Sequence, residues 1–284
     1  MVTLLASPDA PAAELVERVE RVAMAVPAPD GHTERREIVV TVVREDRAGH
    51  HPFIVLEHGR GVDAPARAAI GMQAYPANAR YFAALGFVVV VPTRIGYGIS
   101  GGPDVEYTGD CGSKRYAPGI GAALAETRQL LDHVATLPHV DRTRGVILGE
   151  SFGGLLAIAA ASLDLPGVRA AVNFAGGDGG DSLRHVDQPC QPDRLRAAFA
   201  AYGATSRVPT LWLYSRNDRV WGAEYPKGWF AAFRAAGGRG EFVELAADKN
   251  NGHYIFNRNP PAWQPAVERF LAQNGFAAEI PPRR

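Results

Sequence analysis

The stretch GVILGESFGGLLAIA, residues 145–159, is the part of the chain that most directly indicates the fold. Its first, apolar part predicts a buried strand at 145–149, and the Ala/Leu-rich part predicts a helix over 153–163. Between them stands a Gly-x-Ser-x-Gly pattern centred on Ser151. A turn this tight excludes side chains at the glycine positions, and its strain raises the serine hydroxyl above the end of the sheet. The alternative is a flexible turn whose serine only caps the helix. The strand before it and the helix after it favour the strained turn.

Short apolar strands alternate with helices along most of the chain. Residues 14–26 fit either a short helix or a first edge strand. The alternation predicts one α/β domain over residues 1–284, with a mostly parallel central sheet of about eight strands and helices on both faces. We expect residues 1–30 to be an N-terminal extension and strand 36–45 to lie antiparallel at one sheet edge. The other expected strands are 53–59, 87–92, 145–149, 168–177, 209–215 and 240–246, and the expected helices are 77–86, 119–137, 153–163, 225–237 and 260–275.

The composition argues against several classes of function. The chain has 284 residues, of which 46% are hydrophobic, and this is enough to bury a large core. Its 30 basic and 30 acidic residues cancel and are scattered, so we expect neither nucleic acid nor a membrane as a partner. No apolar run approaches the roughly 18–20 residues that cross a bilayer. The first residues also lack the basic and long apolar segments of a secretory signal.

A serine hydroxyl becomes a good nucleophile only when a base takes its proton. In the chain order serine, acid, histidine, that base lies after Ser151. Two histidines follow it, His185 and His253. His185 lies in a loop after a predicted strand and fits a solvated surface position. His253 lies in a Gly/Asn loop just after the last strand, so we predict that His253 is the base.

The acid that orients this histidine is expected in a loop at the same end of the sheet. Asp218 lies three residues past the strand at 209–215 and is the favoured candidate, although an aspartate in such a turn is often only a turn former. Asp248, close to His253 in sequence, and Glu224, further along the loop after Asp218, are the weaker candidates.

Two backbone amides are candidates for binding a developing oxyanion. The amide of Phe152 opens the helix after the turn, where the helix dipole favours negative charge. The second is expected from LEHGRG, residues 56–61, a variant of the His-Gly-Gly-Gly loop, with the amide of Arg60 as donor. His58 is assigned a structural role. A glycine-rich loop also suits phosphate, but the chain lacks a Gly-Lys-Ser/Thr or Gly-x-Gly-x-x-Gly motif, so a nucleotide site is disfavoured.

Five segments together resemble the α/β-hydrolase fold, and more narrowly its dienelactone-hydrolase-like esterase branch, which is related to prolyl-oligopeptidase-type domains. The resemblance covers roughly residues 36–275. One departure matters: the best-known dienelactone hydrolases use a cysteine nucleophile, whereas this chain has Ser151. The difference favours ordinary ester chemistry over a dienelactone substrate. The segments are VLEHGRG, YFAALGFVVVVPTRIGYGISGG, LGESFGG, LWLYSRND and NGHYIF.

The resemblance implies a carboxylic ester hydrolase with a Ser151, Asp218 and His253 triad that passes through an acyl-enzyme. It implies no metal and no organic cofactor, a small-molecule ester as substrate, and a monomer or homodimer. A serine peptidase and an acyltransferase are the alternatives among enzymes. A non-catalytic binding protein with this fold is the alternative from another class, and the intact set of serine, histidine and aspartate argues against it.

Two long loops, 94–118 and 176–194, are expected to overhang the serine, and each carries one of the chain's two cysteines. Cys111 and Cys190 are therefore either two free thiols or a disulfide that joins the loops over the pocket. A disulfide implies a secreted or periplasmic protein whose signal peptide was removed, and free thiols fit the cytoplasm.

Four side chains are candidates for binding substrate. Arg94 and Tyr97, together with Arg60, are placed to bind a substrate carboxylate. For Arg94 the alternative is an ion pair with Asp104 or Glu106. Trp221 either lines an acyl or aromatic pocket or is a half-buried surface residue.

Overall fold

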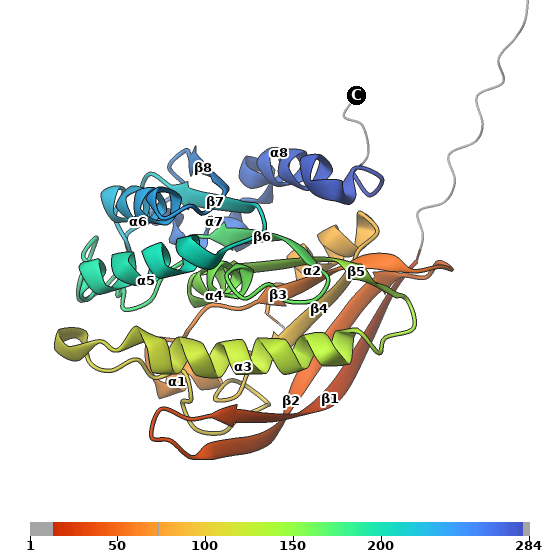
Figure 1. The fold of residues 1–284 in the computed structure, drawn as a ribbon, viewed down its shortest axis with the longest axis horizontal. Helices are drawn as coiled ribbons and strands as arrows, with labels where there is room; N and C mark the ends of the chain where they lie inside the picture. The colour runs from red at the N-terminus through yellow and green to blue at the C-terminus, as the bar shows by residue number, and fades with distance from the viewer. Residues whose placement is uncertain (1–13, 73, 281–284) are drawn as a thin grey trace, which may run out of the picture.

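The computed structural model describes residues 14–72 and 74–280. Within them, eight strands form one sheet in the order β1-β2-β4-β3-β5-β6-β7-β8 (Figure 1). The β1–β2 and β2–β4 pairs are antiparallel and all the other pairs are parallel, which confirms the predicted sheet. The strands are β1 (Leu15–Pro27), β2 (Thr33–Glu45), β3 (His51–Glu57), β4 (Val88–Thr93), β5 (Val140–Glu150), β6 (Val168–Phe174), β7 (Thr210–Ser215) and β8 (Gly240–Leu245).

Helices cover both faces of the sheet, as the alternation of strands and helices predicts. Buried side chains of α2 and α8 share one cluster on one face, and those of α3, α4, α5 and α6 form the clusters on the other. The helices are α1 (Ala64–Ala68), α2 (Pro76–Ala84), α3 (Tyr116–Val134), α4 (Phe152–Ala161), α5 (Pro192–Thr205), α6 (Glu224–Ala235), α7 (Ile255–Arg258) and α8 (Pro260–Leu271). No helix in this described part of the chain is long and apolar enough to cross a membrane.

Of the two alternatives for residues 14–26, the first edge strand is the one observed, whereas the strand predicted at 36–45 does not lie at the edge. β1 is the edge strand and pairs with β2 along its whole length, from Leu15 opposite Glu45 to Pro27 opposite Thr33. The strand predicted at 36–45 is therefore second in the sheet. The described part of residues 1–30 belongs to the fold and is not an extension, because Val22, Met24 and Val26 of β1 are buried in one cluster with side chains of α3. Residues 1–13 lie outside the described part.

Helix α5 was not predicted from the sequence. Its apolar signal is thin, because only Leu195, Phe199 and Gly203 are buried. Their i, i+4, i+8 spacing is nevertheless that of one helical face, and Pro192 at the first turn is a helix-start signal. The predicted loop 176–194 consequently ends at Pro192.

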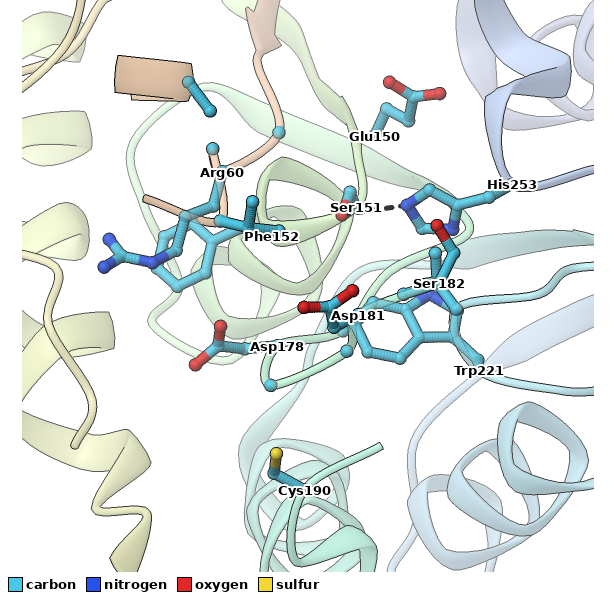
Figure 2. Close-up of a pocket in the computed structure, with 18 of the residues that line it drawn as sticks. Arg60, Glu150, Ser151, Phe152, Asp178, Asp181, Ser182, Cys190, Trp221 and His253 are labelled. Carbon is cyan, nitrogen blue, oxygen red and sulfur yellow. Dashed lines mark hydrogen bonds between the residues drawn. The ribbon is translucent and has the colours of Figure 1, made fainter. Parts of the chain in front are cut away.

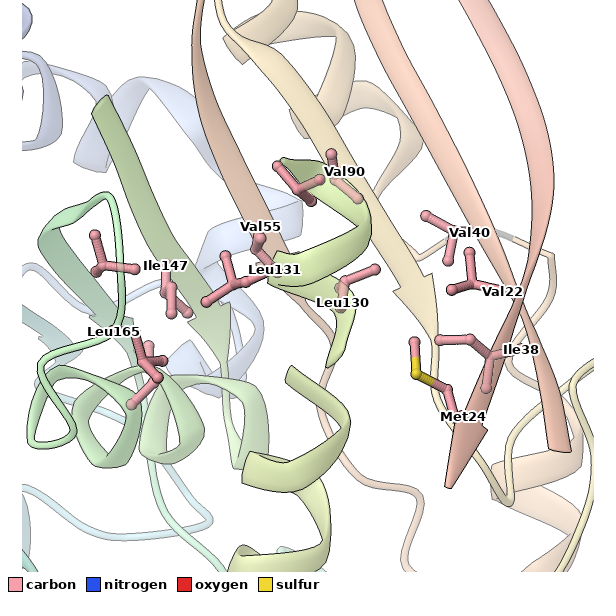
Figure 3. Packing of buried hydrophobic residues seen from close by; sticks show 14 of the residues in the cluster. Val22, Met24, Ile38, Val40, Val55, Val90, Leu130, Leu131, Ile147 and Leu165 are labelled. Carbon is pink, nitrogen blue, oxygen red and sulfur yellow. The ribbon is translucent and has the colours of Figure 1, made fainter. Parts of the chain in front are cut away.

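The core between the sheet and α3 is built from branched aliphatic side chains of neighbouring strands. Figure 3 shows Val22, Ile38, Val90 and Val55 facing Leu130 and Leu131 of the helix. This packing continues onto α4, in which every residue is buried. A helix that is apolar on all sides in this way is typical of the centre of an α/β fold.

The parallel register brings the carboxyl ends of the central strands level with one another. Glu57, the last residue of β3, lies opposite Gly149, and Glu150 at the end of β5 lies opposite Phe174 of β6. The loops after these strands therefore meet at one edge of the sheet, where sheets of this kind place their binding sites.

Candidate active site

Ser151 lies in the strained turn that the sequence predicts between β5 and α4. Its backbone has φ 57° and ψ −121°, outside the conformations that a non-glycine residue adopts without strain. A Cβ on Gly153 would lie 2.2 Å from the carbonyl oxygen of Glu57, and one on Gly149 would lie 2.4 Å from the Gly153 backbone. The two glycines are therefore required by close backbone packing and not by flexibility.

Ser151, His253 and Asp218 form a continuous hydrogen-bonded row. The Ser151 Oγ lies 3.1 Å from His253 Nε2 (Figure 2). On the other side of the ring, His253 Nδ1 lies 3.0 Å from Asp218 Oδ2. Asp218 is 1% exposed and His253 is 4% exposed, so water does not compete for these bonds. The carboxylate accepts the proton of Nδ1, which leaves Nε2 free to accept the serine proton.

The charge balance of the row favours a basic histidine. Burial alone lowers the pKa of His253, but the Asp218 carboxylate opposes this and the net pKa is raised above its usual value. The second oxygen of Asp218 accepts the backbone amides of Val220 and Trp221, at 2.8 and 3.1 Å. These bonds fix the carboxylate and stabilise its charge.

Two asparagines that the sequence analysis missed hold the acid loop and the histidine loop together. Asn251 Oδ1 accepts the amides of His253 and Arg219, each at 3.0 Å. Asn217 accepts the amide of Asp248 at 2.9 Å and donates to the Asp248 carbonyl at 3.2 Å. The signal was present in the sequence, since asparagine side chains commonly bridge backbone groups in turns.

The weaker candidates for the base and the acid lie apart from this row. His185 lies in the loop after β6, where it pairs with Asp181 in an isolated bridge. Asp248 accepts a hydrogen bond from Asn259, 2.9 Å away. Glu224 forms an ion pair with a lysine on its own helix. None of the three contacts Ser151 or His253 among the interactions of the described residues.

Both residues that carry the candidate oxyanion donors lie beside the turn. Phe152 is the first residue of α4, so its amide has no partner within the helix. Arg60 lies in the loop after β3, which packs so closely that a Cβ on Gly59 would lie 3.2 Å from Ser151 Cβ. Within the described residues, the amides of Phe152 and Arg60 have no backbone acceptor.

His58 has the structural role that the sequence predicts. It is 1% exposed, its Nδ1 donates to the Gly59 carbonyl at 2.7 Å, and its Nε2 accepts the Arg94 amide at 3.1 Å. Burial and the neighbouring Arg94 charge hold the pKa of His58 well below its usual value. The neutral ring joins the loop after β3 to the loop after β4.

Arg94 and Tyr97 do not reach the pocket, which corrects their predicted role in substrate binding. Arg94 is 1% exposed and donates to Glu57 at 3.0 Å and to Glu106, so the alternative of an ion pair with Glu106 is the one observed. The Tyr97 hydroxyl also donates to Glu106, and burial raises its pKa well above the usual value. In this buried cluster of Arg94, Tyr97, Glu57 and Glu106, the glutamates balance the charge of the arginine.

The guanidinium of Arg60 is also committed within the protein. It donates to the Asp104 carboxylate in a two-pronged ion pair, one arm of which spans 2.7 Å. The side chain lines the pocket, but its charge is already neutralised. Of the three residues predicted to bind a carboxylate, Arg60, Arg94 and Tyr97, only Arg60 lines the pocket. Its backbone amide remains the candidate oxyanion donor.

The row opens into a pocket of about 740 Å³. Trp221 lines it, with its ring edge-on to His253 at 5.5 Å between centroids (Figure 2). Its indole N–H donates to the Ala175 carbonyl. Cys111 and Cys190 also line the pocket and are joined in a disulfide, which links the loops that overhang the serine. The described residues contain no group of histidine, cysteine or acidic side chains arranged to hold a metal ion.

The fold and this order of residues are those of an α/β-hydrolase. The model of the dienelactone hydrolase family matches residues 66–236, which is more than half of the chain. The chain therefore belongs to the dienelactone hydrolase family. No curated protein matches the sequence.

Solved structures with the same fold include esterases and a peptidase. A putative dienelactone hydrolase from Klebsiella pneumoniae is 20% identical with a TM-score of 0.57, over 92% of this chain and 99% of that one. An acetyl xylan esterase from Paenibacillus sp. R4 is 18% identical with a TM-score of 0.59, over 92% and 89%. The acylaminoacyl peptidase of Pyrococcus horikoshii is 16% identical with a TM-score of 0.60, over 90% of this chain but 41% of that one. At these identities the likeness establishes the fold alone.

Proposed function

We propose that the protein is a serine hydrolase that cleaves carboxylic esters of small or aromatic substrates through an acyl-enzyme. The observation that carries the proposal is the buried row of hydrogen bonds from Ser151 through His253 to Asp218, which opens into a pocket. A hydroxyl 3.1 Å from a basic imidazole, itself oriented by a carboxylate, is the arrangement that activates a serine nucleophile.

The proposed reaction has two halves. His253 Nε2 takes the Ser151 proton as Oγ attacks the ester carbonyl, and Asp218 stabilises the imidazolium that forms. The amides of Phe152 and Arg60 donate to the oxygen of the tetrahedral intermediate. The alcohol leaves with the proton held by His253. Water, deprotonated by His253, then attacks the acyl-enzyme and releases the acid.

The charges of the pocket favour an ester without a negative charge of its own. Among the described residues, three cationic side chains line the pocket, and each is paired with a carboxylate. A substrate carboxylate would have to compete with the carboxylates that already pair with these cations. It would therefore gain little electrostatic attraction in this pocket. A volume of about 740 Å³ leaves room for an aromatic group beside Trp221. The pairs are Arg60 with Asp104, Lys114 with Asp178, and Arg184 with Asp181.

A fluorophosphonate probe followed by peptide mass spectrometry tests the proposal. We expect one adduct, on Ser151, that is absent from Ser151→Ala and retained in Ser182→Ala, because Ser182 lines the same pocket and is not hydrogen-bonded to a histidine within the described part of the chain. A panel of aryl esters, sugar acetates and peptidyl anilides then separates ester from peptide hydrolysis. Absence of any adduct on Ser151 would contradict the proposal and favour a binding protein, and turnover of anilides alone would favour a peptidase.

A further inference from the structure

Tyr75 lies between the two parts of the site that carry the candidate oxyanion donors. It precedes α2, with its backbone in the left-handed region at φ 55°, and its ring lines the pocket. The Tyr75 hydroxyl accepts the amide N–H of Gly59 at 3.2 Å and donates its own proton to Glu150 Oε2. Gly59 directly precedes Arg60, and Glu150 directly precedes Ser151. One hydroxyl thus bridges the loop after β3 and the nucleophile turn.

We propose that Tyr75, held by Glu150, is a positioning residue that sets the distance between the Arg60 amide and the Phe152 amide. The inference rests on the proposed function, since it concerns the oxyanion that the proposed reaction forms. Phe152 is fixed by the turn and by α4, whereas Arg60 is carried by a loop with glycines on either side. Other residues must therefore hold the Arg60 loop at the right distance from the Ser151 turn.

Gly59 is hydrogen-bonded through both of its polar backbone groups. Its N–H, which belongs to the His58–Gly59 peptide unit, donates to Tyr75, and its carbonyl, which belongs to the Gly59–Arg60 unit, accepts from His58 Nδ1 at 2.7 Å. The His58 bond therefore acts on the unit that carries the Arg60 N–H, and the Tyr75 bond ties the unit before it to the nucleophile turn through Glu150. Loss of the Tyr75 bond would leave the loop held by His58 alone and free to shift relative to the serine.

Glu150 is suited to anchoring a hydroxyl more than to contacting a substrate. It is 5% exposed, and its Oε1 is buried without a partner within the described residues. Burial raises the pKa of Glu150, and the hydrogen bond from Tyr75 acts against that shift. A tyrosine hydroxyl has one proton, and that of Tyr75 is donated to Glu150. Tyr75 therefore orients the site and does not itself donate to the oxyanion.

The Tyr75 ring is fixed by a further contact. It packs edge-on against Phe256, with 5.1 Å between ring centroids. Phe256 lies on α7, three residues after His253. The Tyr75 ring thereby contacts the segment that follows His253, and its hydroxyl joins the loop that carries Arg60 to the turn that carries Ser151. These contacts hold the three parts of the site in place relative to one another.

Steady-state kinetics of Tyr75→Phe on the best ester found for the wild type tests this inference. A displacement of about 1 Å in a catalytic donor costs on the order of 10²-fold in rate. We expect kcat to fall about 10- to 100-fold with KM changed less than about threefold. The matched control is Tyr107→Phe, whose hydroxyl lines the same pocket but donates to Asp110, and which should keep wild-type kcat. An unchanged kcat in Tyr75→Phe, or a rise in KM alone, would overturn the proposal.

A pair of variants at the anchor gives a second test that does not depend on the folding of Tyr75→Phe. Glu150→Gln retains a carbonyl oxygen that accepts the tyrosine proton, so we expect it to keep kcat within about threefold, whereas Glu150→Ala should lose about tenfold or more. Equal losses in the two variants would overturn the positioning role. Fluorophosphonate labelling of wild-type Ser151 keeps the two proposals apart, because its absence contradicts the proposed function and leaves nothing to compare among the variants.

Discussion

The disulfide between Cys111 and Cys190 is expected to stabilise the folded protein strongly while contributing little to the chemistry. The two cysteines are 79 residues apart in sequence. Closing a loop of that length in the unfolded chain corresponds to about 4–5 kcal/mol of free energy of unfolding on the chain-entropy model. Replacement of both cysteines by serine should therefore lower the free energy of unfolding by up to that amount.

The same loops remain joined by hydrogen bonds that do not involve sulfur. The Tyr116 hydroxyl donates to the Cys190 carbonyl at 2.6 Å, and the Arg194 guanidinium donates to the Lys114 carbonyl at 2.7 Å. Because these backbone acceptors survive the substitution, the pocket should keep its shape at low denaturant. We expect kcat within about threefold of wild type and a much lower urea midpoint.

Urea titration followed by tryptophan fluorescence measures this effect, since the four tryptophans are buried. The double serine variant is compared with the oxidised wild type, and thiols are counted in the denatured, unreduced wild type. Two reactive thiols in that sample would refute the pairing. Zero thiols with equal urea midpoints for the two proteins would refute the entropic argument. A large loss of kcat would show that the hydrogen bonds alone do not hold the loops.

Three further substitutions test other parts of the structure. Asp218→Asn should reduce kcat by on the order of 10⁴-fold, and the acid limb of kcat/KM should move to lower pH because the carboxylate that raises the pKa of His253 is gone; a pH profile with an unmoved limb would contradict the pairing. Arg94→Ala leaves the buried Glu57 without its cation and Glu106 with only Arg60, 3.8 Å away, so we expect the free energy of unfolding in urea to fall by about 3–5 kcal/mol; a loss below about 1 kcal/mol, as for an exposed ion pair, would contradict this. Gly153→Ala places a Cβ 2.2 Å from the Glu57 carbonyl oxygen, so we expect a loss of about 1–3 kcal/mol in stability together with loss of fluorophosphonate labelling, and wild-type labelling would show that the turn is not constrained as described.

Much of the site was predictable because its signals are local. The backbone packing of a single turn requires the glycines around Ser151. The five residues of the sequence motif are also the residues that form this turn. His253 and Asp218 were predicted from their positions just after strands, since parallel strands present their carboxyl ends at one edge. The order of the strands in the sheet was harder to predict. Residues 14–26 were left as either a short helix or a first edge strand, and strand 36–45 was placed at the edge, whereas β1 is the edge strand and β2 is second.

The chemistry of Arg94 and Tyr97 was decided by tertiary packing. Both follow β4, which made them candidates for the pocket on sequence grounds. In the structure their side chains are buried against Glu57 and Glu106. An arginine is taken out of water only where carboxylates neutralise it. The location of Glu57 depends on how β3 pairs with β4, and that of Glu106 depends on how the loop after β4 folds back onto Arg94.

The sequence by itself determined the strand–turn–helix around Ser151, the class of fold and the order of nucleophile, acid and base, because these follow from the periodicity and backbone restrictions of short segments. Only the tertiary structure decided which carboxylate meets the histidine, which cations are neutralised, and that Tyr75 bridges Gly59 and Glu150. Those outcomes depend on contacts between residues up to 75 positions apart, as Tyr75 and Glu150 are. Such partners are selected by the distance between the groups, by their burial and by the one hydrogen bond that a hydroxyl can donate. A short segment of sequence predicts none of these.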